Sequence, residues 1–422
     1  MDESVKAGVA NGELMTDEQT QVESMVDFLL STQAEDALAL LAQRELAAHS
    51  HLPLLTELRA VYTAQQAAAL LTLAITRQRA AAKFPDAAHL FFTPEALEQA
   101  TAWPIAQHRA AHLHRHASSG PVLDLGCGIG GDTLALARYR PVVAYETDPV
   151  RLRFAQANAA VQRLTGEVEF RLADWTGELA ADRLPAAAAA FADPARRVDG
   201  RRLFGLERMI PPLSVLLRLQ ARIPALGVKV APGVADDEIP SGCGVEFISH
   251  EGTCKEAVLW FGSLADGGRR WASVYDAIGW HQIVASPTSP PLGELAVGYY
   301  LHEPDPAVIR AGPFAELCEM LGAHLFDSQI AYLVGPQGGE GSGAAPFVQS
   351  FQIEEIHPFS LKILNQRLQV LGIGQVELKR RGPPIEPESL RPRLKLVAGG
   401  RPGVVILTRR GDERLLLLAR RV

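Results

Sequence analysis

The sequence predicts an α/β fold in which a doubly wound parallel sheet lies between an α-helical region and a small α+β domain. Three patterns predict this order. Apolar residues recur at three- and four-residue spacing over about 18–113, short β-rich and helical runs alternate over 121–264, and strands with one helix close the chain. We therefore place the helical region at 1–112, the α/β domain at 113–285 and a C-terminal α+β region at 290–422, with a small domain at about 350–422.

The first region is predicted to be helical because its apolar side chains follow one helix face, as in residues 67–75. We expect breaks near 51–53 and 83–86, where prolines interrupt the pattern. Thr93 followed by Pro94 predicts a helix start, since threonine caps a first turn and proline fits its first position. The next predicted helix, around 105–114, leads directly into the first strand.

The middle region alternates strands and helices. We expect strands at 122–126, 142–146, 168–174, 189–194, 227–232, 245–250 and 257–262, and helices at 132–139, 149–164 and 210–221. Because only six residues separate the last two strands, these should form an antiparallel hairpin. The Gly-, Pro- and Ser-rich stretch 285–293 indicates a domain boundary.

The C-terminal region is predicted to be a small α+β domain. It follows a glycine-rich loop at 335–343 and contains a helix at 360–371, a basic strand at 376–381 and a closing hairpin around 411–412.

Composition limits the class of protein. No apolar run reaches the roughly 18–20 residues that span a bilayer, and the start lacks the pattern of a secretory signal, so we expect no membrane partner and a cytoplasmic location. The four cysteines form no CxxC pair. The sequence therefore predicts neither a disulfide framework nor a metal site.

Charge is distributed unevenly along the chain. Residues 1–60 hold 3 basic and 11 acidic side chains, whereas residues 361–422 hold 14 basic and 5 acidic ones. Clustered lysines and arginines favour a polyanionic partner, because binding releases counterions from phosphates. A solvated face with arginines near helix ends explains the count equally well.

A glycine loop follows the first predicted strand. Gly126, Gly128 and Gly131 satisfy G-x-G-x-x-G, and Glu146 follows twenty residues after the first glycine, as in dinucleotide sites. Two flanking acids argue against a dinucleotide, because Asp124 and Asp132 would repel a pyrophosphate. The same acids attract the sulfonium and ammonium groups of S-adenosylmethionine, which we predict as the cofactor.

Further residues complete this predicted cofactor site. The glycines, including Gly130, let the backbone pass close to the methionine part of the cofactor, and Glu146 accepts the two ribose hydroxyls. Asp174, ending the next strand, is predicted to accept the adenine amine; the alternative is a cap for the following turn. His108 and Arg109 are further candidates, for binding the methionine carboxylate of the cofactor.

The acceptor site is predicted at Asp193, Pro194 and Arg196, which follow the fourth strand. An Asp-Pro step at a strand end fixes the carboxylate where open α/β sheets bind ligands. There Asp193 can position the acceptor and take up its proton, while Arg196 and its neighbour Arg197 hold a phosphate or carboxylate. A turn with solvated arginines is the alternative.

Several of these motifs resemble a known family. VLDLGCGIGGDTLALA, VVAYETDP, LAD and FADPARR are similar to the nucleotide-binding motifs of class I methyltransferases, and DPAR resembles the DPPY or NPPY step of enzymes that methylate nucleic-acid amines. KFPDAAHLFFTPEALEQAT, GVKVAPG, CKEAVLWFG and HPFSLKILNQRLQVLGIGQVELKRRG resemble bacterial class I methyltransferases with a C-terminal THUMP-like domain.

The resemblance implies a Rossmann-like, seven-stranded class I methyltransferase core with an antiparallel last strand. It also implies that the basic C-terminal domain binds RNA, since THUMP-type domains are RNA-binding modules. The candidate contacts in this sequence are Lys362, Lys379, Arg380, Arg381, Arg391, Arg393 and Lys395.

One departure from the family pattern affects the chemistry. Amine methylases carry an aromatic residue after the two prolines, to stack on the flipped base, whereas this chain has Ala195 and Arg196. Another aromatic side chain would have to stack, and the candidates are Phe84, Phe91, Phe92 and Trp103, for which helix packing is the favoured role.

The favoured hypothesis is thus an S-adenosylmethionine-dependent methyltransferase that acts on RNA. A base amine is preferred over carbon as the acceptor, because no cysteine lies near Asp193 in the sequence. The alternatives are an RNA-binding protein that keeps the cofactor fold without turnover, a methyltransferase with a non-RNA acceptor and a dinucleotide-dependent enzyme.

Overall fold

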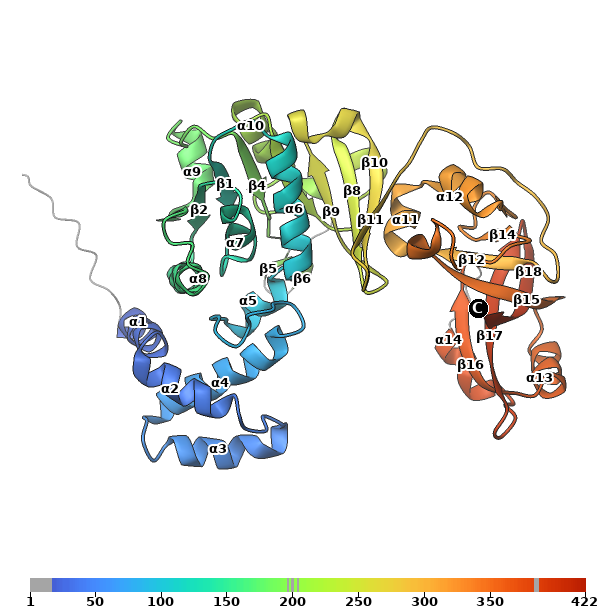
Figure 1. The fold of residues 1–422 in the computed structure, drawn as a ribbon, viewed down its shortest axis with the longest axis horizontal. Helices are drawn as coiled ribbons and strands as arrows, with labels where there is room; N and C mark the ends of the chain where they lie inside the picture. The colour runs from blue at the N-terminus through green and yellow to red at the C-terminus, as the bar shows by residue number, and fades with distance from the viewer. Residues whose placement is uncertain (1–16, 196, 199–200, 203–204, 383–386) are drawn as a thin grey trace, which may run out of the picture. The chain divides into compact units, whose positions relative to one another are not determined.

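The computed structural model describes residues 17–195, 197–198, 201–202, 205–382 and 387–422 (Figure 1). The chain forms two compact units. The first comprises residues 1–193 and 221–223, and the second comprises residues 194–220 and 224–422.

The first unit begins with the predicted helices. They are α1 (Asp17–Leu29), α2 (Thr32–Leu41), α3 (His51–Leu58), α4 (Ala64–Ala80), α5 (Pro94–Gln99) and α6 (Trp103–His116). Thr93 caps α5 as predicted, with Oγ1 accepting the Ala96 N–H at 3.1 Å. The break predicted near 51–53 lies earlier, at 42–50 between α2 and α3, because Pro53 fits the first turn of α3, where no intrahelical N–H bond is lost.

The first unit continues with four parallel strands in the order β4-β1-β2-β3. These are β1 (Val122–Leu125), β2 (Val142–Glu146), β3 (Val168–Leu172) and β4 (Ala189–Ala192), alternating with α7 (Gly131–Ala137), α8 (Pro149–Val161) and α9 (Trp175–Ala180). Every residue of β1, β2 and β4 is buried, as expected for a parallel sheet covered on both faces. Because the strands are parallel, their carboxyl ends share one edge, where ligands bind in open α/β sheets.

The second unit contains the remaining strands of the α/β domain. Its elements here are β5 (Arg197–Val198), β6 (Arg201–Arg202), α10 (Leu213–Arg222), β7 (Leu226–Val230), β8 (Gly244–His250), β9 (Thr253–Trp260), β10 (Arg270–Tyr275) and β11 (Trp280–Val284). The predicted hairpin of β8 and β9 is confirmed, and β9 pairs antiparallel with both β7 and β8. Strands β10 and β11 extend the sheet beyond β8 and were not predicted.

The end of the second unit is a mixed sheet in the order β13-β14-β12-β15-β18-β17-β16 (Figure 1). Its elements are β12 (Tyr300–Pro304), α11 (Pro306–Ala311), α12 (Phe314–Leu321), β13 (His324–Leu325), β14 (Leu333–Gly335), β15 (Val348–Pro358), α13 (Leu361–Val370), β16 (Ile373–Arg380), α14 (Pro387–Leu390), β17 (Arg401–Arg410) and β18 (Glu413–Arg421). The predicted closing hairpin is β17–β18.

Strand alternation gives this C-terminal sheet two apolar cores. Ile406 and Leu417 face a cluster that includes Phe351, whereas their neighbours Val405 and Leu416 face the cluster formed with α13. Over the described residues, no helix combines the length and apolar character needed to cross a bilayer.

Candidate active site

The glycine loop joins β1 to α7 in a conformation that favours glycine. Gly126, Gly128 and Gly130 have φ values of 95°, 56° and 91°, which L side chains rarely adopt. The amides of Gly126 and Cys127 donate to the Tyr145 carbonyl at 3.0 and 2.9 Å, fixing the loop to the end of β2. A Cβ on Gly128 would meet no atom within 4 Å, so the space beside this residue is open.

Glu146 ends β2 and binds the glycine loop directly. One carboxylate oxygen accepts the Gly128 N–H at 2.8 Å, and the other accepts the N–H groups of Thr147 and Asp148 at 2.8 and 3.0 Å. The side chain is 8% exposed. The structure therefore places Glu146 and Gly128 together, as a shared cofactor site requires.

Asp124 lies on β1 beneath the loop and is fully enclosed. Its carboxyl accepts a short hydrogen bond from Thr133 of α7. Burial, together with the nearby charges of Asp132 and Asp193, raises the pKa of Asp124 to about 7, against the lowering effect of Thr133 and Arg109. The predicted residues 124, 132 and 193 thus lie in one electrostatic cluster.

Arg109 of α6 belongs to this cluster. Its Nη2 donates to Asp132 Oδ1 at 2.5 Å, and its guanidinium lies 4.7 Å from the ring centroid of Phe191 on β4. The Arg109 side chain is only 1% exposed. The sequence suggested Arg109 as a contact of the methionine carboxylate; in the structure it balances part of the negative charge beside the loop.

Asp174 follows β3 and caps α9. Its Oδ1 accepts the N–H of Thr176 at 2.8 Å and the hydroxyl of the same residue at 2.7 Å. These contacts are those of the alternative interpretation, a helix cap. Asp174 is exposed, and its role in binding adenine stays a prediction.

The predicted acceptor residues begin where β4 ends. Asp193 is half-buried, and its N–H donates to the Leu125 carbonyl at 3.5 Å. Pro194 is buried, and Ala195 exchanges two backbone hydrogen bonds with Ile210, at 2.8 and 3.0 Å. Arg196 lies outside the described residues, so its predicted role stays a prediction.

Sequence reasoning missed Asn158, a buried polar residue of α8. Its side-chain amide accepts the Phe91 N–H at 2.7 Å and donates to the carbonyls of Phe91 and Ile129 at 3.1 and 3.0 Å. Asn158 thereby connects the glycine loop to the segment that precedes α5. The available signal was an asparagine at an apolar helix position, because a buried amide requires partners.

The four aromatic candidates for base stacking have packing partners. Phe84 and Phe92 are each 3% exposed with ring centroids 5.5 Å apart, Phe91 lies 5.8 Å from Phe154, and Trp103 packs under the guanidinium of Arg138. This agrees with the favoured role in helix packing.

The basic run 379–381 does not form a single patch. Because side chains alternate along β16, Lys379 and Arg380 face opposite ways. Arg381 follows the strand and lies on the side of Lys379, since both approach Glu303. Lys379 forms a short ion pair with Glu303, and Arg381 approaches the same carboxylate at 3.6 Å. Arg380 is exposed.

The remaining predicted RNA contacts lie beside α13. Arg391, Arg393 and Lys395 are exposed. Asn365 of α13 accepts the Lys395 N–H at 2.8 Å and donates to the Arg393 carbonyl at 3.1 Å, so this segment follows the helix that carries the exposed Lys362. Arg391 also approaches β16, where its Nη1 donates to the Val376 carbonyl at 3.5 Å.

The cysteines show no sign of nucleophilic activation. Burial raises the pKa of Cys127 well above its usual value, with Asp124 and Glu146 adding to the increase. In the part of the chain that the structure describes, no three His, Cys, Asp or Glu residues are grouped to bind a metal ion.

Comparisons with known proteins agree with this geometry. Residues 116–185 match the family described as "Methyltransferase domain", and residues 348–421 match the family described as "THUMP domain-like". A Mycobacterium tuberculosis protein, named "uncharacterized S-adenosylmethionine-dependent methyltransferase" in two strains, is 35% identical over 359 residues, covering 82% of this chain and 94% of that protein. A crystal structure named "putative methyltransferase" from Porphyromonas gingivalis W83 has a TM-score of 0.70 and covers 95% of this chain and 98% of that chain. At 18% identity, this second likeness concerns the fold alone.

Proposed function

Since the chain belongs to the S-adenosylmethionine-dependent methyltransferases, we propose that it transfers the methyl group of S-adenosylmethionine to RNA. The observation that carries the proposal for the donor is the carboxylate-rich loop. Asp124 and Asp132 flank the glycine turn, where a sulfonium and an ammonium are attracted and a pyrophosphate is repelled. The residues present therefore fit this cofactor better than a dinucleotide.

We assign roles to the residues of the loop on this basis. Glu146 accepts hydrogen bonds from the ribose hydroxyls. These replace the hydrogen bonds that its oxygens now accept from the amides of Gly128 and Thr147. Gly128 leaves the open space that the methionine part requires. Asp124, ionised, faces the cationic end of the cofactor. When bound, S-adenosylmethionine supplies an electrophilic methyl group on sulfur.

The acceptor is assigned to the carboxyl edge of β4. Asp193 lies next to the Asp124 cluster, so a group held by Asp193 is also close to the glycine loop. In this role Asp193 orients the acceptor and takes up its proton. An amine fits better than a pyrimidine carbon, because carbon methylation commonly needs a cysteine thiolate and Cys127 is held as a buried thiol.

RNA as the acceptor is supported by the C-terminal domain. Residues 348–421 match the THUMP-like family, and this family's resemblance to RNA-binding modules implies an RNA partner. Exposed cations are present on α13, at Lys362, and on the segment 391–395 that Asn365 of α13 holds, where they can neutralise phosphates.

Methyl transfer tests the proposed function directly. RNA from cells that lack the gene should accept tritium from labelled S-adenosylmethionine when wild-type protein is added. Asp193→Ala should reduce the rate about 100-fold or more, whereas Asp237→Ala, an exposed acid on another segment, should not. Mass spectrometry of the nucleosides would then identify the modified base.

The possible outcomes separate the alternatives. Cofactor binding without transfer to any RNA, but with RNA binding, would favour a non-catalytic RNA-binding protein, which the missing aromatic residue after Pro194 suggests. Transfer only to protein or small molecules would mean a non-RNA acceptor. Failure to bind S-adenosylmethionine would contradict the proposal as a whole.

A further inference from the structure

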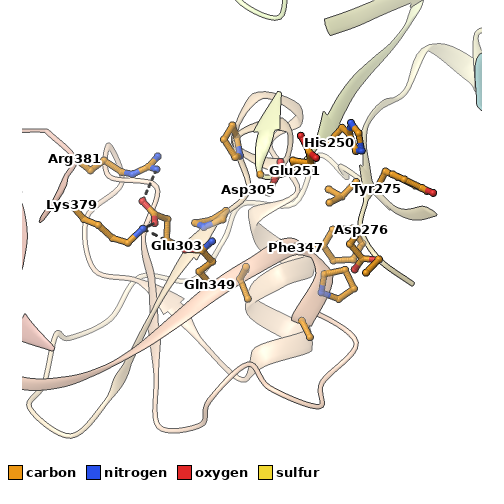
Figure 2. A pocket seen from close by; sticks show the side chains of 18 residues that line it. His250, Glu251, Tyr275, Asp276, Glu303, Asp305, Phe347, Gln349, Lys379 and Arg381 are labelled. Atoms are coloured by element: carbon orange, nitrogen blue, oxygen red, sulfur yellow. Dashed lines mark hydrogen bonds and ion pairs between the residues drawn. The ribbon is translucent and has the colours of Figure 1, made fainter. Parts of the chain in front are cut away.

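A cavity of about 900 Å³ in the second unit has no role in the site described above. It is lined by the turn after β8, the end of β10, the end of β12, the start of α11 and the start of β15. Lys379 of β16 and Arg381, just after this strand, complete the lining. Figure 2 shows that its ends differ: Lys379 and Arg381 lie at one end, and His250 and Tyr275 lie at the other. We call this cavity the groove.

The basic end of the groove is an anion site that a carboxylate fills. Lys379 and Arg381 both pair with Glu303 (Figure 2). Lys379 also lies 3.3 Å from Glu377. The two cations are positioned from behind by aromatic rings, with Lys379 Nζ 4.9 Å from the Phe351 centroid and the Arg381 guanidinium 4.9 Å from Tyr332. A phosphate has the same charge sign and the same acceptor geometry as the carboxylate that they hold.

The other end of the groove offers aromatic rings. The rings of His250 and Tyr275 have centroids 5.3 Å apart, and Tyr275 lies 5.0 Å from Trp280 of β11. His250, Tyr275 and Trp280 are half-buried, so each retains exposed surface. Rings of this kind stack on nucleic-acid bases without regard to sequence.

Carboxylates lie beside these rings and limit what can bind. Asp276 accepts the N–H groups of Ile278 and Gly279, and Asp305 caps α11 and accepts the Ser249 hydroxyl at 2.8 Å. Glu251 is exposed in the turn after β8. Their negative charge disfavours a phosphate at this end, but their oxygens can accept hydrogen bonds from amines.

We propose that the groove binds one short single-stranded segment of RNA, with a phosphate at Lys379 and Arg381 in place of Glu303 and a base stacked on Tyr275. This inference rests on the proposed function. It identifies a second place, distant from the reacting atoms in the sequence, where the protein contacts the RNA. Because carboxylates surround the stacked base, bases with an exocyclic amine are preferred over uracil. An extended basic peptide would meet Lys379 and Arg381 at the basic end of the groove, where like charge disfavours it.

Fluorescence anisotropy with labelled r(A)12, r(C)12 and r(U)12 tests the groove on the full chain. We expect wild-type protein to bind the first two at least several-fold more tightly than the third. Tyr275→Ala should weaken binding of r(A)12 about tenfold, since stacking contributes strongly per base, and Tyr275→Phe should restore it. Tyr139→Ala, an exposed tyrosine of the first unit, serves as the matched control.

The basic end is tested with opposite changes in charge. Arg381→Ala should weaken binding of all three oligonucleotides equally and reduce the salt dependence by about one ion. Glu303→Gln should strengthen binding several-fold, because it frees the two cations for phosphate. Arg59→Ala removes an exposed arginine elsewhere and should leave affinity unchanged.

The results distinguish failure of the groove from failure of the proposed function. If wild-type protein binds and methylates RNA while the variants at 275, 303 and 381 bind as wild type does, the groove is not the site and the proposed function stands. If the protein binds S-adenosylmethionine but no RNA, both proposals fall. Binding of an arginine-rich peptide that Tyr275→Ala abolishes, without RNA binding, would also overturn the groove assignment.

Discussion

The glycine-loop site and the C-terminal sheet differ in how their charged side chains are arranged. Beside the loop, the charges of Asp132 and Asp193 raise the pKa of the buried Asp124, and Arg109 balances only part of this negative charge. In the C-terminal sheet, cations have carboxylate partners across the strands, as in Arg401 with Glu354 at 2.8 Å. Crowded like charges favour a ligand of opposite sign, whereas paired charges are already satisfied.

This difference explains why a count of charges misrepresented the basic tail. The tail carries 14 basic side chains, but Arg367 pairs with Glu355, Arg420 donates to Gln352 and Arg421 pairs with Glu377. Exposed cations such as Arg393 and Lys395 can meet a phosphate directly, whereas Lys379 and Arg381 can do so only when the phosphate replaces Glu303. Binding capacity therefore depends on where the carboxylates lie.

The largest effect is expected from removing the buried arginine of the loop site. Arg109→Ala should lower the free energy of unfolding by about 3–5 kcal/mol, because breaking a buried ion pair leaves Asp132 uncompensated next to Asp124. Urea unfolding followed by circular dichroism measures this. The double variant Arg109→Ala, Asp132→Asn should recover part of the loss; equal stability of the two variants would contradict the electrostatic explanation.

Removing the ribose acceptor should have the next largest effect, on binding. Glu146→Ala should weaken the binding of S-adenosylmethionine about 100-fold, because two hydrogen bonds to a charged acceptor, each about 1.5 kcal/mol, are lost. Isothermal titration calorimetry measures the change. Glu178→Ala, at an exposed pair with Arg183, is the matched control; an equal loss in both variants would contradict a specific role for Glu146.

Asp124 should make cofactor binding depend on pH. Its raised pKa of about 7 means that the carboxyl is protonated below pH 7 and ionised above it. The affinity for S-adenosylmethionine should therefore rise up to about tenfold per pH unit below 7 and level off above it. Asp124→Asn should bind more weakly and show a flat profile between pH 5.5 and 7.5 by calorimetry.

The same group should affect stability with the opposite sign. A carboxyl whose folded pKa exceeds its unfolded value stabilises the fold below the unfolded pKa, and this contribution is lost as pH rises toward about 7. Urea unfolding of wild-type protein should thus show a pH-dependent loss that Asp124→Asn lacks. A profile unchanged by the substitution would indicate that another group titrates.

The smallest effect is expected at a paired cation of the C-terminal sheet. Arg401→Ala should lower the free energy of unfolding by no more than about 1 kcal/mol, because the pair is partly exposed and screened by solvent. Urea unfolding at low and high salt checks this value. A loss as large as that of Arg109→Ala would remove the contrast between the two regions.

Local patterns predicted much of the fold and part of the site. The strand, glycine turn and helix around 122–137 were predicted because each depends on a few consecutive residues, and the Thr93 cap for the same reason. The β8–β9 hairpin followed from the short connection between its strands. Strands β10 and β11 were missed, since no two-residue turn signal joins them.

Contacts between distant residues could not be predicted in this way. Asn158 meets Phe91 across 67 residues, and Lys379 meets Glu303 across 76. Such pairs depend on which faces of helices and strands pack together, which periodicity alone does not specify. The role of Asp174 as a cap also needed the structure, because a strand-end aspartate is equally suited to a ligand and to a helix N-terminus.

Local sequence patterns were sufficient to predict a methyltransferase core with acids around a glycine loop, because helix and strand type, turn chemistry and residue type depend on neighbouring residues. Which charged side chains are buried or paired, by contrast, depends on the tertiary structure. In the folded chain Asp124 is buried near other carboxylates, Arg109 pairs with Asp132, and Lys379 and Arg381 pair with Glu303. The physical reason is that burial and partner distance set the energy of a charge, and both are properties of the folded chain.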